Sequence, residues 1–338
     1  MSADQLVLVT GATGFVASAV VLAYLERGFR VRATARSQEK IDKWEKKHAG
    51  KFDKSKLEWA IVKDIAVAGA FDEAIKGVTI LAHTASPFHY DVKDNEKDML
   101  IPAIEGTRHA LRAAQKEASV SRVVVTSSFA SILDFNKLGP DTTYTHEDWN
   151  PATYESAAKS DQMPYVYCAS KKIAEEEAWK ISKEPETKWS LTVLCPPMIF
   201  GPPQQVIESM HALNTSAGAV WDVVDKKEVP PTLFPVWVDL RDMANLHVDA
   251  TTKDVAKGQR YLCVAGHHDN SQIAAIGRKA FPDQAHRFPD APVSAGNPHF
   301  KTDSSKVEKE LGVKWIPFEQ SVKDTLAELF AVEKSLKN

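Results

Sequence analysis

The fold of this chain is decided by the stretch LVLVTGATGFVA, residues 6–17. Its first four residues are apolar and predict a buried strand, and the apolar run that follows the second glycine predicts a helix over 16–27. Two spaced glycines permit a tight turn between strand and helix, so that the backbone can approach a pyrophosphate at the helix N-terminus. The residues predicted to bind a dinucleotide there are Gly11, Thr13, Gly14, Phe15 and Val16.

Short β-branched runs alternate with amphipathic stretches through the first half of the chain. The predicted strands after the first are 30–35, 57–62, 78–83, 122–126 and 191–195, and the predicted helices are 38–48, 95–117 and 165–183. This alternation predicts an α/β fold, a doubly wound Rossmann-like parallel sheet. Prolines then break the rhythm. We therefore expect a nucleotide-binding domain over 1–195, with a returning segment near 236–265, and a smaller C-terminal substrate lobe within 196–338.

The end of the second strand indicates which dinucleotide is bound. A site for NAD usually has an acidic residue there for the ribose 2′-hydroxyl. Here Arg36 could pair with a 2′-phosphate, Ser37 could donate a hydrogen bond and Lys40 could add charge. The sequence therefore favours NADPH/NADP+. After the third strand, Asp64 could accept from the adenine amino group while Ile65 packs on the ring.

Tyr167 and Lys171 lie four residues apart in a predicted helix, so their side chains share one face. A cation beside the phenol favours phenolate and lowers the tyrosine pKa, which suits general acid–base catalysis near neutral pH. Alone, the pair is more typical of a solvated surface helix. Ser128 follows the predicted strand 122–126, where ligands of doubly wound sheets bind.

Composition limits the other possibilities. The chain has 338 residues, is 43% hydrophobic and 26% charged, and has a formal net charge of −3, which argues against a nucleic-acid partner. Its apolar runs are far shorter than the ~20 residues that span a bilayer, so we expect no membrane association. Cys168, Cys195 and Cys263 are widely spaced, and the adjacent pair His267-His268 has no spaced partner. We expect no metal and a reducing, cytoplasmic location.

Eight short motifs carry a resemblance to a known family. The chain resembles the extended short-chain dehydrogenases/reductases, and within them the fungal aldehyde and ketone reductases related to dihydroflavonol and cinnamoyl-CoA reductases. The motifs are TGATGFVA at 10–17, ARSQEK at 35–40, HTASPF at 83–88, GT at 106–107, TSS at 126–128, YCASK at 167–171, PPMIFGP at 196–202 and WVDLRDMA at 237–244. Two positions depart from the pattern, because Ala103 and Cys195 stand where related chains often have Asn.

The resemblance implies roles for individual residues. Ser128, or its neighbour Ser127, would polarise the substrate carbonyl, Tyr167 would protonate the developing alkoxide, and Lys171 would lower the tyrosine pKa and bind the nicotinamide ribose. Further cofactor contacts would come from Ala85, Pro197 and Ile199, and the pocket would be lined by Phe88, Phe129, Met198 and Trp221. Such an apolar lining suits a small hydrophobic carbonyl.

The resulting hypothesis is NADPH-dependent reduction of aldehydes and ketones by a monomer or homodimer. Two alternatives share the fold: a hydroxysteroid dehydrogenase, and a sugar-nucleotide epimerase or dehydratase, which would prefer tightly held NAD. A third is a non-catalytic NADP(H) sensor, which would have no need of the pair Tyr167 and Lys171.

Overall fold

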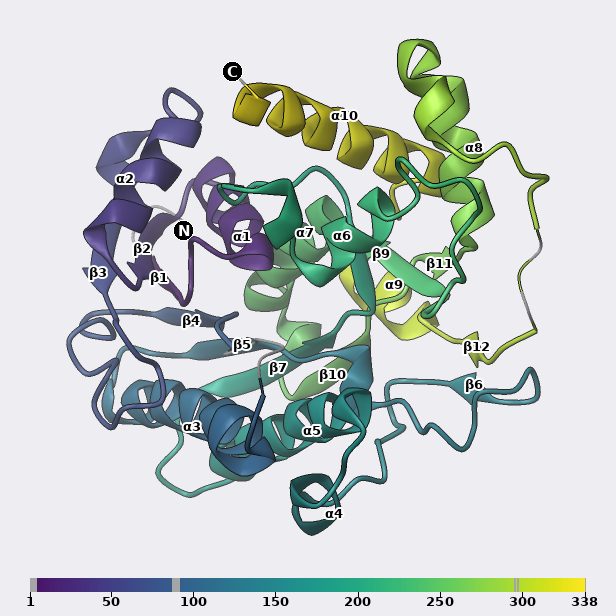
Figure 1. The fold of residues 1–338 in the computed structure, drawn as a ribbon. Helices are drawn as coiled ribbons and strands as arrows, with labels where there is room; N and C mark the ends of the chain where they lie inside the picture. The colour runs from purple at the N-terminus through teal and green to yellow at the C-terminus, as the bar shows by residue number, and fades with distance from the viewer. Residues whose placement is uncertain (1–4, 87–91, 295, 297, 338) are drawn as a thin grey trace.

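A seven-stranded parallel sheet forms the centre of the molecule, in the order β10-β7-β5-β4-β1-β2-β3 (Figure 1). The structure, a computed structural model, describes residues 5–86, 92–294, 296 and 298–337. The predicted Rossmann-like α/β fold is confirmed. The strands are β1 Leu6–Val9, β2 Arg30–Ala35, β3 Leu57–Ile61, β4 Ile80–His83, β5 Arg122–Thr126, β7 Ser190–Cys195 and β10 Gln259–Leu262.

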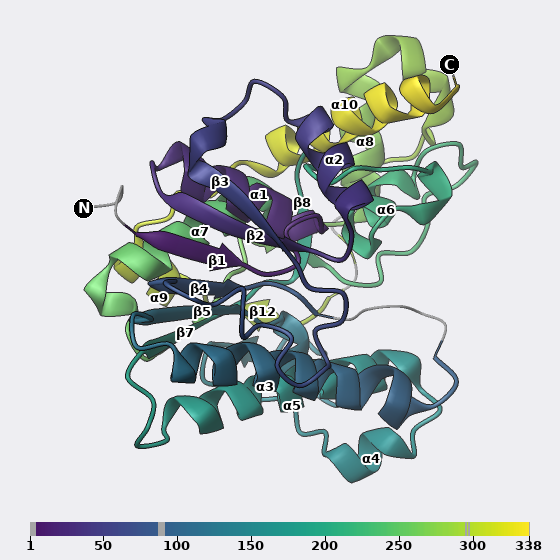
Figure 2. The same ribbon diagram turned by 90° about the vertical axis from the view of Figure 1, so that its left-hand side faces the viewer.

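Helices cover both faces of this sheet (Figure 2). On one face lie α1, Phe15–Glu26, and α7, Leu240–Thr252; on the other lie α3, Ile101–Lys116, and α5, Met163–Ser182. α1 is apolar nearly all round because it is enclosed between the sheet and α7, where the Tyr24 hydroxyl donates to the carbonyl of His247 at 3.0 Å. The remaining helices are α2 Gln38–Lys47, α4 Tyr154–Ala158, α6 Thr215–Trp221, α8 Asn270–Ala280, α9 Ser305–Leu311 and α10 Phe318–Lys337.

The predicted helix over 95–117 has two parts. Residues Glu96–Leu100 form a π-helical turn, and the regular helix α3 begins at Ile101. Pro102 explains the change, because it has no N–H to donate to the carbonyl four residues earlier and so cannot continue an α-helical ladder from the preceding turn.

A smaller sheet of three strands lies beside the first. It contains β8 Met198–Phe200, β9 Val236–Asp239 and β11 Gly266–His267, in the order β11-β9-β8. An apolar cluster that includes Phe200, Trp237, Ile273 and Leu326 joins this sheet to α8 and α10. The chain then returns to the main sheet through α7 and β10, whereas β9 pairs with β8. The short strands β6 Thr143–Tyr144 and β12 Lys301–Thr302 pair with each other.

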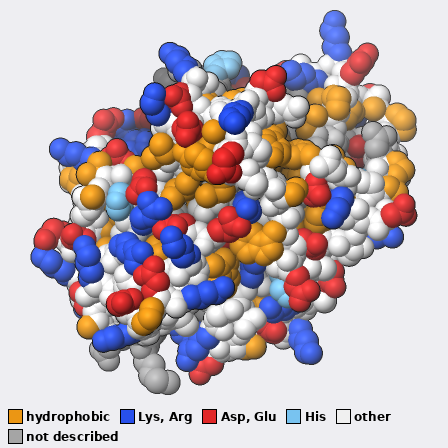
Figure 3. Space-filling model, turned by 90° about the horizontal axis from the view of Figure 1, so that it is seen from below, with side chains coloured by type: hydrophobic (Ala, Val, Ile, Leu, Met, Phe, Trp, Pro, Cys, Tyr) orange, Lys and Arg blue, Asp and Glu red, His pale blue; other side chains and the backbone are white. Residues whose placement is uncertain are grey.

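The face covered by α3 and α5 has acidic and basic side chains intermixed with hydrophobic ones (Figure 3). Ion pairs connect α3 to this segment: Arg108 Nε lies 2.8 Å from Glu177 Oε1 of α5, and Arg112 pairs with Glu184, which follows the end of α5. None of the helices in the described residues has the length and apolar character needed to cross a membrane.

Candidate active site

The turn between β1 and α1 is shaped by glycine. Gly11 has φ +67°, and a Cβ added there would lie 3.0 Å from the Ala85 Cβ, so the turns that follow β1 and β4 pack more tightly than a side chain at position 11 would easily allow. The Gly11 N–H donates to Thr34 Oγ1 at 2.9 Å. Gly14 is the N-cap of α1 and offers no side-chain acceptor, which leaves the first N–H groups of the helix open to an anion.

Thr10 fixes the neighbouring turn after β4. Its Oγ1 accepts from the N–H groups of Thr84 and Ala85, both at 3.0 Å, and lies 3.0 Å from His83 Nδ1. Because the hydroxyl has one proton and both acceptor positions are taken, it donates to His83 Nδ1. Burial lowers the His83 pKa to about 4, so the ring is neutral and its proton lies on Nε2. Ala85 is thereby held against Gly11.

The end of β2 is basic and exposed. Arg36 and Lys40 are exposed, and the Arg36 side chain has no hydrogen bond or ion pair with any residue that the structure describes. Ser37 is the N-cap of α2, and its side chain accepts from the Lys40 N–H at 3.4 Å. The acidic Glu39 is paired with Lys43 Nζ at 2.5 Å. The residues present therefore fit a nucleotide with a 2′-phosphate.

Asp64 and Ile65 follow β3 in different environments. Asp64 is exposed, and its Oδ1 accepts from the Ala66 N–H at 2.8 Å. Ile65 packs on Gly106 of α3, where an added Cβ would lie 2.8 Å from Ile65 Cδ1. Gly106 is thus the residue that lets Ile65 lie against the helix.

Tyr167 and Lys171 lie on α5, with Lys171 Nζ 5.7 Å from the centre of the tyrosine ring. Lys171 Nζ donates to Ser86 Oγ at 2.6 Å. Burial lowers the Lys171 pKa to about 8, because the ammonium loses hydration. The structure therefore brings together the predicted acid–base pair and the turn that contacts Gly11.

The two adjacent serines after β5 point into different surroundings. Ser127 is buried and donates to Glu175 Oε2 at 2.5 Å. Ser128 is half-buried, and its Oγ accepts from the Ala130 N–H at 3.1 Å. The Ser128 proton has no acceptor among the described residues, whereas that of Ser127 is already engaged.

The site residues predicted after β7 have different surroundings. Pro197 and Met198 are half-buried beside β8, and the N–H of Ile199 donates to Ser216 Oγ at 3.0 Å. Trp221 packs on Phe330, with 5.3 Å between ring centres. Phe88 lies outside the described residues.

Phe129 is not brought to a pocket surface. Its ring is fully buried and packs on Tyr144, Phe234 and Phe300. The ring is buried because the short 3-10 turn Phe129–Ser131, capped by Ser128, directs it into the hydrophobic core.

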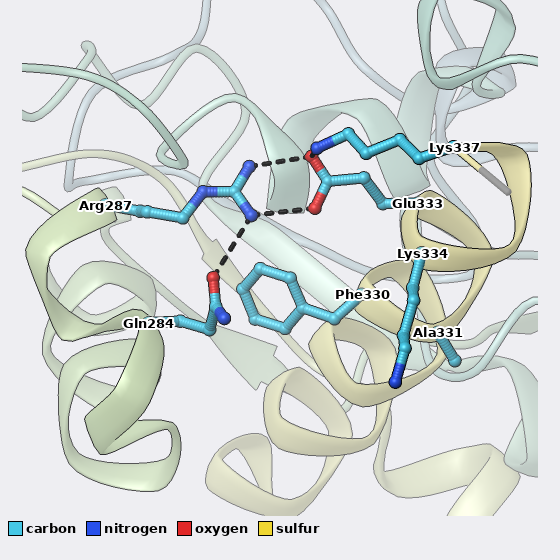
Figure 4. Close-up of a pocket in the computed structure, with 7 residues that line it drawn as sticks. All are labelled: Gln284, Arg287, Phe330, Ala331, Glu333, Lys334 and Lys337. Carbon is cyan, nitrogen blue, oxygen red and sulfur yellow. Dashed lines mark hydrogen bonds and ion pairs between the residues drawn. The ribbon is translucent and has the colours of Figure 1, made fainter.

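A hollow of about 550 Å³ lies against α10, away from these residues in sequence (Figure 4). Arg287 lines this hollow. Its guanidinium group is bonded to Glu333 and Gln284, as Figure 4 shows, and also to Asp225. Those partners take up the N–H donors of Arg287. Within the described part of the chain, no group of three or more His, Cys, Asp or Glu side chains could hold a metal ion.

Two residues near the site were missed by sequence reasoning. Ser86 belongs to the motif at 83–88, but its contact with Lys171 joins residues 85 positions apart and leaves no local signal. Glu175 could have been noticed, because it continues the four-residue spacing of Tyr167 and Lys171 along the same helix.

Comparison with known proteins shows the family of the chain. Residues 8–267 match the model of the 3-beta hydroxysteroid dehydrogenase/isomerase family. The chain is 38% identical over 344 residues to a putative NADPH-dependent methylglyoxal reductase of Candida albicans, which covers 97% of this chain and 99% of that protein. It is 33% identical over 329 residues to a cinnamoyl-CoA reductase of Medicago truncatula, with 96% and 95% covered.

A similar solved structure supports the same family and fold. The crystal structure of yeast methylglyoxal/isovaleraldehyde reductase complexed with NADPH matches with a TM-score of 0.88 and 32% identity, covering 98% of this chain and 99% of that one. The fold and these matches define an extended short-chain dehydrogenase/reductase, as the motifs predicted. More narrowly, the chain belongs to the 3-beta hydroxysteroid dehydrogenase/isomerase family.

Proposed function

We propose that this protein reduces aldehydes and ketones to alcohols with NADPH. The observation that carries the proposal is the placement of the Lys171 ammonium beside the Tyr167 ring and against Ser86, close to a turn suited to a dinucleotide. The names of the related methylglyoxal reductases support both the cofactor and the reaction class.

The cofactor assignment rests on two groups of NADPH, the pyrophosphate and the 2′-phosphate. The turn at Gly11 and Gly14 suits the pyrophosphate, and exposed Arg36 and Lys40 suit the 2′-phosphate, with Ser37 between them. Asp64 and Ile65 would lie at the adenine. Thr13, Phe15, Val16, Ala85, Pro197 and Ile199 complete the proposed set.

The chemistry follows from the side chains on α5 and after β5. When bound, NADPH supplies the hydride. Ser128 Oγ would donate to the carbonyl oxygen, which polarises the carbon and stabilises the growing negative charge. Tyr167 Oη would donate the proton that completes the alcohol, and the Lys171 ammonium favours the phenolate left behind. Ser128 is preferred to Ser127 because the Ser127 proton is held by Glu175.

The substrate we propose is a small hydrophobic carbonyl, with half-buried Met198 as a contact and residues 196–338 supplying much of the substrate side. The description of the family model favours a second candidate, a hydroxysteroid. We propose the cytoplasm as the location, which the three free, buried cysteines support.

The test is a carbonyl panel assayed by loss of NADPH absorbance, with methylglyoxal, branched and aryl aldehydes, ketones and a 3-keto steroid. We expect reduction of aldehydes or ketones, and Tyr167→Phe to lower kcat by about 10²–10⁴-fold while the NADPH Kd stays nearly unchanged. Unchanged turnover in Tyr167→Phe, or reduction of the steroid alone, would overturn the proposal.

A further inference from the structure

A buried ion pair lies directly behind the two serines after β5. Arg260 of β10 and Glu175 of α5 have side chains that are 7% and 0% exposed, and Arg260 Nε donates to Glu175 Oε1 at 2.6 Å. The guanidinium also donates to the carbonyls of His146 and Asp148 and stacks 3.8 Å from the centre of the Trp149 ring. Removing two charges from water is costly, so such a buried ion pair suggests a role other than stabilising the fold.

The second carboxylate oxygen of Glu175 holds the serine turn. Oε2 accepts from Ser127 Oγ at 2.5 Å and from Ser131 Oγ at 2.6 Å. Ser131 Oγ also accepts from Arg260 Nη2 at 3.0 Å and lies 2.7 Å from the carbonyl oxygen of Ser128. Because a hydroxyl has one proton, Ser131 donates either to Glu175 or to that carbonyl, and both bonds hold the same turn. One oxygen atom therefore holds the turn on both sides of Ser128, through the residue before it and the residue three positions after it.

Glu175 also shares a helix with the acid–base pair. Tyr167, Lys171 and Glu175 follow one another at four-residue spacing on α5, so each lies one helical turn from the next. The carboxylate thus connects the helix that carries Tyr167 and Lys171 with the turn that carries Ser128.

The direction of the hydrogen bonds matters for Ser128. Arg260, Trp179 and Ser127 all donate to Glu175, as neighbours of an ionised carboxylate do. With its proton directed at Glu175, the Ser127 hydroxyl is turned into the core, and Ser128 is the serine left facing outward. A glutamine at 175 would place an amide N–H group opposite either Arg260 or the two hydroxyls, and in the second case would reverse the bonds that hold the turn.

We infer that Glu175 is a positioning residue of the reaction, which fixes Ser128 relative to Tyr167 and Lys171 through Ser127 and Ser131. This inference rests on the proposed carbonyl reduction. Glu175 touches neither substrate nor cofactor; it acts by holding the carbonyl-binding hydroxyl in register with the proton donor. Small misplacements of a reacting group lower rates by up to about 10²-fold.

The experiment is a double-mutant cycle between Glu175→Gln and Ser128→Ala, with kcat and KM measured for the best aldehyde or ketone of the panel. The matched control is Glu176→Gln, the neighbouring residue on α5, whose half-exposed carboxylate pairs with Lys172 at 2.9 Å. NADPH Kd and the midpoint of thermal unfolding are measured for every variant.

We expect Glu175→Gln to lower kcat by about tenfold to a hundredfold, with the NADPH Kd unchanged and the control active. In the Ser128→Ala background the same substitution should lower kcat no further, because its effect passes through Ser128. A merely structural role would lower kcat equally in both backgrounds, and that result overturns the inference.

Ser127→Ala keeps the proposal testable if Glu175→Gln does not fold, because it removes one link and leaves the ion pair with Arg260 intact. Its expected effect is a smaller loss of kcat that also vanishes in the Ser128→Ala background. If Ser127→Ala is as inactive as Tyr167→Phe while Ser128→Ala keeps its rate, the inference is wrong. A wild type that reduces no aldehyde or ketone refutes the proposed function itself, and so is distinguishable from these outcomes.

Discussion

Arg36→Ala tests whether the end of β2 recognises a 2′-phosphate. Arg36 is exposed and its side chain has no hydrogen bond or ion pair with the described residues, so the substitution removes no contact that stabilises the fold. A charge-assisted hydrogen bond contributes ~1.5–3 kcal/mol, and exposure to solvent favours the lower end of that range. We therefore expect NADPH to bind about tenfold more weakly at ~0.1 M salt, since ~1.4 kcal/mol corresponds to a tenfold change in Kd.

The assay is fluorescence titration of NADPH and NADH, with Arg30→Ala as the matched control. Arg30 is also exposed and begins the same strand, but it lies six residues, or ~20 Å, from Arg36. NADH affinity and the unfolding midpoint should change little in either variant. Raising the salt concentration should weaken NADPH binding to the wild type more than to Arg36→Ala, because the lost contact is an exposed charge pair. Equal losses of NADPH and NADH affinity would refute the assignment.

Three further predictions concern other parts of the site and fold. Gly11→Ala should weaken the binding of NADPH and NADH alike by about 1–2 kcal/mol, because alanine is strained at positive φ and its Cβ would lie 3.0 Å from Ala85 Cβ, so the backbone that faces the pyrophosphate must shift. Titration against both cofactors checks this. The Lys171 pKa is lowered from 10.5 to about 8, so the unfolded chain binds the extra proton between those values. Wild type should therefore gain stability relative to Lys171→Met as pH rises from 8 towards 10.5, and denaturant midpoints showing the opposite trend would contradict it. Gly277→Ala should lower the free energy of unfolding by about 1–3 kcal/mol, because its Cβ would lie 2.3 Å from Phe288, whereas Gly139→Ala, in open space, should change it by less than ~0.5 kcal/mol.

Much of the fold was predictable because its signals are local. The observed β2, Arg30–Ala35, and β5, Arg122–Thr126, have the predicted bounds, since each is a short run that contains β-branched residues and follows a helix. The helix over 95–117 was predicted as continuous, yet its first turn is π-helical because Pro102 interrupts the hydrogen-bond ladder. The substrate pocket was the least predictable part: Phe129 is apolar and next to Ser128, but the turn it begins directs it into the core.

By itself, the sequence determined the parallel sheet, the glycine turn at Gly11 and Gly14 and the pairing of Tyr167 with Lys171 on one helix face. Each of these features depends on the types and spacing of residues that are close in sequence, so the sequence pattern indicates it directly. Only the tertiary structure decided that Ser127 faces Glu175 while Ser128 does not, and that Lys171 bonds Ser86. Those contacts join residues 48 and 85 positions apart, so they exist only once separate strands and helices have packed together.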